Sequence, residues 1–123
     1  MENQRIKPYL NCSFECDCGR THNSLFAHFI FEPGAIEKLP KLLAELGYTR
    51  PYLICDTHTY EIAGKKAEDV LRRAELPFAV HVLQSPENSD LAADEQALGS
   101  IAMGNDREAD IIISVGTGTI NDL

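Results

Sequence analysis

A glycine-rich turn that directly follows an apolar run is the part of the sequence best suited to bind a charged ligand. The run Ile111–Val115 has the composition of a buried strand, and Gly116-Thr117-Gly118-Thr119 follows it at once. Glycine lets the backbone approach a ligand closely, and amides at the start of a helix point toward a phosphate. We therefore expect this turn to hold a phosphate group, although such turns are also common without one. The helix that should follow is missing, so we expect these residues to be the front of a longer protein.

Asp56 is a second candidate binding residue because it follows another predicted buried strand, Pro51–Cys55. In open α/β sheets, ligands bind beyond the carboxyl ends of the parallel strands. Asp56 and Gly116 both lie at such ends. An aspartate directly before a helix is equally well explained as a helix cap.

Three cysteines near the start of the chain could bind a metal together with a histidine. Cys12 and Cys16 are separated by three residues, as are Cys18 and His22, and the four side chains could in principle surround zinc. Cys12, Cys16 and Cys18 are all an even number of residues from Phe14. In a strand, side chains at such positions lie on one face, which explains the pattern without any metal. Ligands only one residue apart are awkward for a strand, so we assign no metal ligand from the sequence and leave open whether these four side chains bind zinc. The remaining histidines are predicted to be packed or solvated: His28, His58 and His81.

The elements that position these residues begin with a predicted β-hairpin. Residues 12–31 read as two extended arms joined by a turn at Cys18–Thr21, the second arm running from His22 to Phe31. A helix is predicted to start at Pro40, after a short turn at 35–39, and to end at Gly47. The hairpin is assigned to residues 1–32.

Residues 33–123 are predicted to form βαβ units. The apolar stripe of Ala63, Ala67, Val70 and Ala74 predicts a helix after Asp56, and a second strand should span Phe78–Leu83. Asp90 is placed to cap a further helix that ends near Gly104, and Ile111–Val115 forms the third strand. Alternating strands and helices predict an α/β fold: a Rossmann-like parallel sheet flanked by helices.

Composition narrows the class of protein. The chain has 123 residues, 44% of them hydrophobic and 24% charged, which fits one globular domain. The formal charge of −8, without a basic patch, argues against nucleic acid as a partner. No segment approaches the roughly 18 apolar residues of a membrane span, and no secretory signal is present, so we expect free thiols and a cytoplasmic protein.

Four segments together resemble the iron-containing alcohol dehydrogenase and dehydroquinate synthase-like superfamily, in particular its branch of sn-glycerol-1-phosphate dehydrogenases. The most specific segment is the loop Val115-Gly116-Thr117-Gly118-Thr119-Ile120-Asn121-Asp122-Leu123. The supporting segments are Pro33-Gly34-Ala35 with Leu39-Pro40 and Gly47, Asp56 with Thr57 and Tyr60, and Cys16-x-Cys18-Gly19-Arg20-x-His22.

This resemblance implies an NAD(P)-dependent dehydrogenase that interconverts dihydroxyacetone phosphate and glycerol 1-phosphate with the help of a divalent metal such as zinc, iron or nickel. By the resemblance, the cofactor pyrophosphate would be held by Gly116, Thr117, Gly118 and Thr119, with Asp122 beside that loop. Asp56 would accept hydrogen bonds from the adenosine ribose, which favours NAD over NADP.

The resemblance also implies that the catalytic site is incomplete in this chain. The family's metal ligands, an aspartate and two histidines, belong to a C-terminal helical domain, so we assign no catalytic residue within 1–123 and expect no turnover from this chain alone. Alternatives are a relative of glycerol dehydrogenase or dehydroquinate synthase, or a stand-alone nucleotide-binding or interaction module. Self-association of copies remains open.

Overall fold

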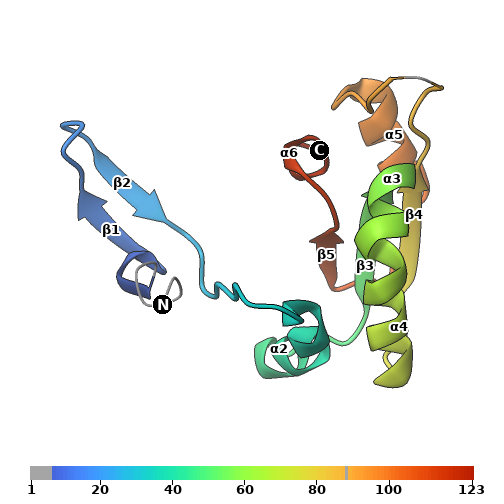
Figure 1. The fold of residues 1–123 in the computed structure, drawn as a ribbon, viewed down its shortest axis with the longest axis horizontal. Helices are drawn as coiled ribbons and strands as arrows, with labels where there is room; N and C mark the ends of the chain where they lie inside the picture. Colours follow the sequence, from blue (N-terminus) through green and yellow to red (C-terminus); the bar gives the residue numbers. More distant parts are fainter. Residues whose placement is uncertain (1–6, 88) are drawn as a thin grey trace. The chain divides into compact units, whose positions relative to one another are not determined.

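The computed structural model describes residues 7–87 and 89–123 of the chain (Figure 1). The chain divides into two compact units, Met1–Ala35 and Ile36–Leu123. The first holds an antiparallel hairpin and the second a parallel sheet flanked by helices, so the predicted α/β fold with an N-terminal hairpin is confirmed.

The hairpin consists of β1 (Cys12–Glu15) and β2 (Thr21–Ser24), preceded by a short 3-10 helix, Lys7–Tyr9. Cys12 pairs with Ser24 and Glu15 with Thr21, so each arm is only four residues long. The predicted second arm, His22 to Phe31, is therefore too long. The backbone N–H of Asn11 still donates to the carbonyl of Phe26, but Lys7–Tyr9 form a 3-10 helix, so the described residues before Asn11 do not continue β1.

The sheet of the second unit has three parallel strands in the order β4-β3-β5. The central strand, β3 (Pro51–Asp56), is buried along its whole length between β4 (Ala79–Leu83) and β5 (Ile111–Ser114). A fully buried parallel strand reads as a continuous apolar run, which is why Pro51–Cys55 was recognisable in the sequence. The predicted limits of all three strands agree with the structure to within one residue.

Helical segments connect the strands. α2 (Leu39–Leu46) follows the 3-10 helix Ala35–Lys38, has Pro40 in its first turn and ends at Gly47, whose φ of 81° explains the glycine. After β3 the chain is helical through α3 (Thr57–Thr59), the π-helical turn Tyr60–Gly64 and α4 (Lys65–Arg73). The remaining helices are α5 (Glu95–Met103) and α6 (Gly118–Asn121). None of the described helices is both long and apolar enough to cross a membrane.

Two expectations about helix ends are wrong. Asp94, and not Asp90, caps α5: its Oδ1 accepts the N–H of Ala97 at 2.9 Å. Residues 91–93 stay outside the helix, and from there Leu91 packs against the core that contains Ala97 and Ile101. A helix running from Asp90 would turn Leu91 away from the face that carries these two residues. The helix after the glycine turn is also not wholly missing, because its first turn is α6.

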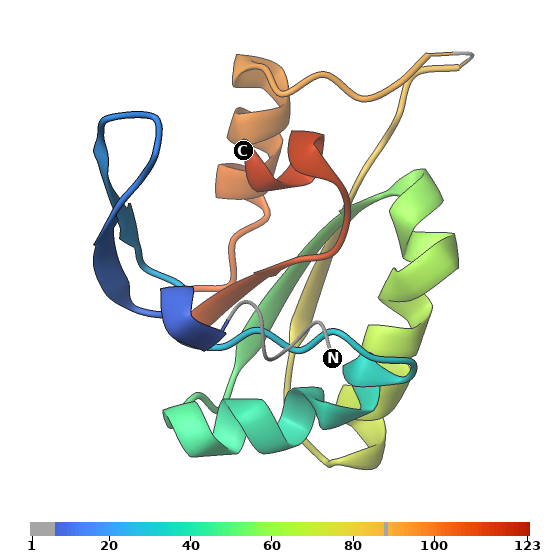
Figure 2. The ribbon, with the colours of Figure 1, turned by 60° about the vertical axis from the view of Figure 1, so that its left-hand side comes forward.

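The helices cover both faces of the sheet, as the two views show (Figures 1 and 2). Leu53 of β3 packs with Leu43 of α2 and with Ala67 and Leu71 of α4. On the other face, the core consists of Tyr52, Ile54, Leu83, Ala97, Ile101 and Ile120, from β3, β4, α5 and α6. The connection after β3 therefore runs along one face and the connection after β4 along the other, and the strand order reverses between β3 and β5. Ligands of doubly wound sheets bind at this switch point.

At the amino ends of β3 and β5, two carboxylates hydrogen-bond the segments that lead into the strands. Asp110 accepts the backbone N–H groups of Thr49 and Arg50 at 2.7 and 2.9 Å, and Asp106 accepts Arg50 Nε at 2.7 Å. These hydrogen bonds lower the pKa of Asp110, chiefly through Thr49, and the Arg50 side chain lowers the pKa of Asp106. The hydrogen bonds from Thr49 and Arg50 to Asp110 help to fix the register of β5 on β3, and with it the position of Gly116.

Candidate functional site

Asp56 and the glycine turn lie side by side at the carboxyl edge of the sheet. β3 and β5 are hydrogen-bonded neighbours, and the N–H of Val115 donates to the carbonyl of Ile54 at 2.8 Å, just beyond the end of β5. A Cβ atom added at Gly116 would lie 3.3 Å from Cγ2 of Thr59. The turn after β5 is thus packed against the first helical turn after Asp56, although some 60 residues separate the two segments in the sequence.

The carboxylate of Asp56 is a helix cap. Its Oδ1 accepts the N–H groups of His58 and Thr59, both at 2.8 Å, and the hydroxyl of Thr59 accepts the N–H of Asp56 at 3.0 Å. This reciprocal capping box holds the side chain with only 9% of the residue exposed. Both capping bonds use Oδ1, so Oδ2 is the oxygen that the cap leaves for another donor.

The glycine turn has one crowded glycine and one open glycine. A Cβ at Gly116 would come within 2.8 Å of Cγ1 of the buried Ile120, so only glycine fits there without displacing a neighbour. A Cβ at Gly118 would meet nothing within 4 Å. Space is therefore left above the first residue of α6, where a ligand can reach the backbone.

The other predicted residues of this loop lie before, within and at the end of α6. Thr117 precedes α6 with an extended backbone, and its hydroxyl makes no capping hydrogen bond. Thr119 is half-buried inside α6. Asp122 ends the helix, its N–H donating to the carbonyl of Gly118 at 2.8 Å, and its side chain is exposed. The structure thus brings together all six residues named from the sequence, five in one loop and Asp56 on the adjacent strand.

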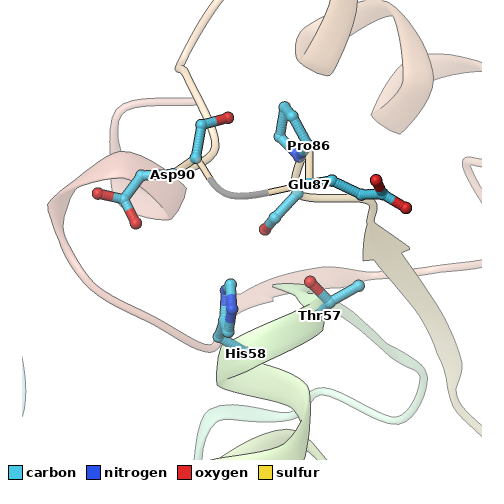
Figure 3. Close-up of a pocket in the computed structure, with 7 residues that line it drawn as sticks. Thr57, His58, Pro86, Glu87 and Asp90 are labelled. Carbon is cyan, nitrogen blue, oxygen red and sulfur yellow. The ribbon is translucent and has the colours of Figure 1, made fainter.

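A cavity of about 520 Å³ opens beyond the ends of β3 and β4, at the same edge of the sheet. Residues of α3 and of the loop after β4 line it: Thr57, His58, Ser85, Pro86, Glu87, Ser89 and Asp90. Figure 3 shows Thr57 and His58 on one side, across from the loop that carries Pro86, Glu87 and Asp90. The Oγ atom of Ser85 is buried and has no hydrogen-bond partner among the described residues. Sequence reasoning missed this part of the edge. The signal was present, because Ser85-Pro86 lies one residue beyond the predicted strand Phe78–Leu83, at the same edge as Asp56.

Three of the four cysteines lie in the hairpin unit, and the fourth, Cys55, lies in β3. Cys16 and Cys18 lie beyond the end of β1, in the turn, so the prediction that one strand face carries all three N-terminal cysteines is wrong. The thiol of Cys12 instead donates to the carbonyl of Pro8. The backbone N–H of Cys18 lowers the pKa of Cys16, whereas burial raises the pKa of Cys55, inside β3, to about 11.

Comparison with known proteins agrees with this geometry. The iron-containing alcohol dehydrogenase family matches residues 30–123. The chain is similar to proteins named glycerol-1-phosphate dehydrogenase (NAD(P)+) from three bacteria. It is 30% identical to that of Halalkalibacterium halodurans over 98% of this chain, 26% identical to that of Geobacillus stearothermophilus over 98%, and 34% identical to that of Bacillus licheniformis over 88%.

The chain spans only about a third of the length of these curated relatives. It covers 31% of the first, 30% of the second and 27% of the third. No solved structure matches the chain.

Proposed function

This chain belongs to the iron-containing alcohol dehydrogenase family, and from that premise we propose that it is the dinucleotide-binding part of an NAD(P)-dependent dehydrogenase. The substrate pair proposed for the whole enzyme is dihydroxyacetone phosphate and glycerol 1-phosphate, because the similar bacterial proteins carry the name glycerol-1-phosphate dehydrogenase. The resemblance of the Gly116–Asp122 loop to that branch points the same way.

The observation that carries the proposal is the contact between the glycine turn and the turn that follows Asp56. Gly116 packs against Thr59, so a carboxylate and a run of backbone amides flank the switch point between β3 and β5. A dinucleotide needs both: amides for the pyrophosphate and an acidic acceptor for the adenosine ribose.

The residues present fit a dinucleotide on two counts. The space above Gly118 admits a pyrophosphate to the amides of Gly118 and Thr119, with the Thr117 hydroxyl as a further donor. Asp56 keeps Oδ1 on its helix cap and presents Oδ2 to the ribose hydroxyls. A 2′-phosphate in that place would meet a like charge, which favours NAD over NADP.

The nicotinamide cofactor, when bound, supplies hydride transfer, and this chain's part is to bind and orient it. The family's catalytic metal does not fit the described residues. Their only group of three potential ligand side chains, Cys16, Cys18 and His22, is a thiolate and imidazole set, not one aspartate and two histidines. We therefore assign no metal-dependent step to this chain and propose that it catalyses no turnover alone.

Titration of the ¹⁵N-labelled chain with NADH, followed by NMR, tests the proposal. The largest amide shifts are expected at Gly116–Thr119 and at Asp56–His58, and weak affinity does not prevent their detection. NADPH should produce smaller shifts at Asp56. If the shifts fall outside these segments, or if NADH produces none at millimolar concentration, the dinucleotide assignment is wrong.

A further inference from the structure

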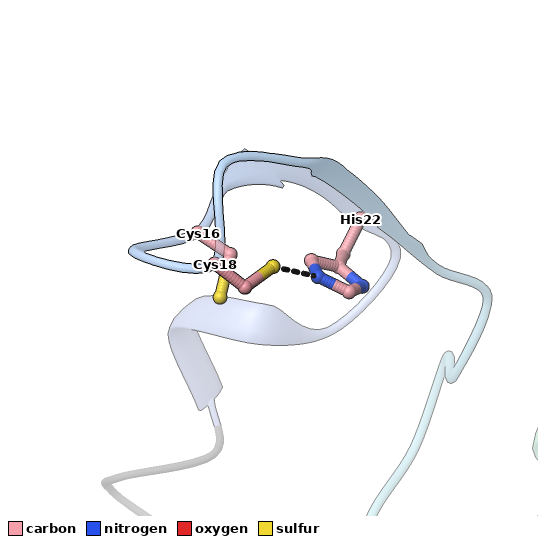
Figure 4. Close-up of side chains that lie close together, drawn as sticks. All are labelled: Cys16, Cys18 and His22. Carbon is pink, nitrogen blue, oxygen red and sulfur yellow. Dashed lines mark hydrogen bonds between the residues drawn. The ribbon is translucent and has the colours of Figure 1, made fainter.

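The turn of the hairpin gathers three side chains that suit a thiophilic cation. The Sγ atom of Cys18 lies 3.1 Å from Nε2 of His22, and these two atoms and the Sγ atom of Cys16 all lie within 4.8 Å of one another. Figure 4 shows both sulfur atoms on the same side of the turn, with Cys18 directed at the imidazole ring. None of the three residues is buried.

Local backbone structure explains why residues so close in sequence converge. The carbonyl of Cys16 accepts the N–H of Gly19 at 2.9 Å, and the N–H of Cys16 donates to the carbonyl of Arg20 at 3.1 Å. Gly19 has a φ of 79°, which favours glycine, and it reverses the chain so that Cys18 lies over the start of β2. His22 pairs with Phe14 across the hairpin and stacks on its ring, with a centroid distance of 5.7 Å.

From this arrangement we propose that Cys16, Cys18 and His22 bind one Zn²⁺ ion at the tip of the hairpin. Zinc takes cysteine sulfur at about 2.3 Å and histidine nitrogen at about 2.0 Å in tetrahedral geometry. Two sulfur ligands are then about 3.8 Å apart, and a sulfur and a nitrogen about 3.5 Å apart. The observed 3.1 Å and the 4.8 Å limit bracket these values, so rotations of the three side chains suffice to close the site.

Zinc binding at this site needs no oxidant, reductant or other reactant. The two thiols release their protons to solvent, both thiolates bind the cation, and His22 binds through Nε2 with its proton on Nδ1. Two thiolates neutralise the charge of Zn²⁺. Cys12 is not a ligand, because its thiol is directed to the carbonyl of Pro8, and water takes the fourth position.

Zinc titration of the reduced, chelator-treated 123-residue chain tests this proposal. One Zn²⁺ should bind per chain, and Co²⁺ in its place should give the intense visible bands of a tetrahedral site together with thiolate charge-transfer absorption. Cys18→Ser and His22→Gln should each weaken Zn²⁺ binding by more than about 100-fold, since loss of a residue that only orients a metal ligand already costs about 10 to 100-fold.

Cys12→Ser is the matched control, because it removes a neighbouring thiol and keeps a donor to Pro8. It should leave zinc affinity unchanged, and circular dichroism should show that all three variants remain folded. The proposal is overturned if the reduced chain binds no stoichiometric zinc, or if Cys12→Ser weakens binding as much as Cys18→Ser. It is also overturned if Cys16 and Cys18 stay joined in a disulfide in the presence of excess reductant.

Discussion

The two glycines of the loop should respond oppositely to the same substitution. A methyl group at Gly116 would lie 2.8 Å from Cγ1 of Ile120 and 3.3 Å from Cγ2 of Thr59. Ile120 is only 2% exposed and cannot turn away freely. Overpacking of this kind costs typically about 1 to 3 kcal/mol, so Gly116→Ala should destabilise the fold by that amount.

Gly118→Ala should instead be neutral or stabilising for folding. The added methyl group meets no atom within 4 Å, and the backbone of Gly118 is helical. Replacing glycine by alanine at a compatible position gains about 0.4 to 1 kcal/mol. The two variants should therefore differ by roughly 1.4 to 4 kcal/mol in free energy of unfolding, measured by urea denaturation of the chain.

The effect of Gly118→Ala on NADH binding should be opposite to its effect on stability. This variant should fold at least as stably as the unsubstituted chain and yet bind NADH poorly. A methyl group at Gly118 occupies the space proposed for the pyrophosphate, so Gly118→Ala should weaken NADH binding at least about tenfold, or 1.4 kcal/mol. Gly118→Val should weaken it further. The NADH titration followed by NMR measures this effect. A stable Gly118→Ala chain with undiminished affinity for NADH would refute the proposed placement of the pyrophosphate.

Three further predictions concern single side chains. Asp56→Ala should destabilise the chain by about 1 kcal/mol through loss of the cap, whereas Asp56→Asn should keep the cap and narrow the preference for NADH over NADPH, as paired titrations would show. The lowered pKa of Asp110 means that its stabilisation is present above the ordinary pKa of 3.8 and is lost as the pH falls through the lower folded value; unfolding free energies measured below about pH 4 should therefore depend less on pH in Asp110→Asn. Because burial raises the pKa of Cys55 to about 11, a thiol reagent should label the other cysteines of the metal-free, reduced chain quickly and Cys55 only after denaturation, as mass spectrometry would show.

The elements that sequence reasoning located well are those whose pattern is fixed by burial. β3 is apolar from Pro51 to Cys55 because helices cover both of its faces, and α2 has an apolar stripe because only one face touches the sheet. Gly47 marks the end of α2 through its positive φ. These signals are local, so the sequence contains them in full.

The elements that it misplaced depend on partners elsewhere in the chain. Residues 25–31 carry an alternating pattern, but Lys7–Tyr9 form a 3-10 helix and no strand that could pair with them, and Leu25 is 86% exposed. Asp90 and Asp94 are both suitable caps, and the second is used because Leu91 packs against the core from a non-helical segment. The prediction that the three N-terminal cysteines share one strand face failed for a related reason. Side chains alternate between the two faces only within a strand, and β1 ends at Glu15, before Cys16 and Cys18.

The candidate site shows the same division between local and distant information. Each half was recognisable alone, since Asp56 and Gly116 both follow apolar runs. Their adjacency was not, because it depends on β5 pairing with β3 and not with the preceding strand β4. That choice follows from α5 lying on the face opposite to α4, which brings the chain back on the far side of β3. A site at a switch point is thus a property of the whole topology, and the fastening of Thr49 and Arg50 by Asp110, at the other end of the sheet, is part of what builds it.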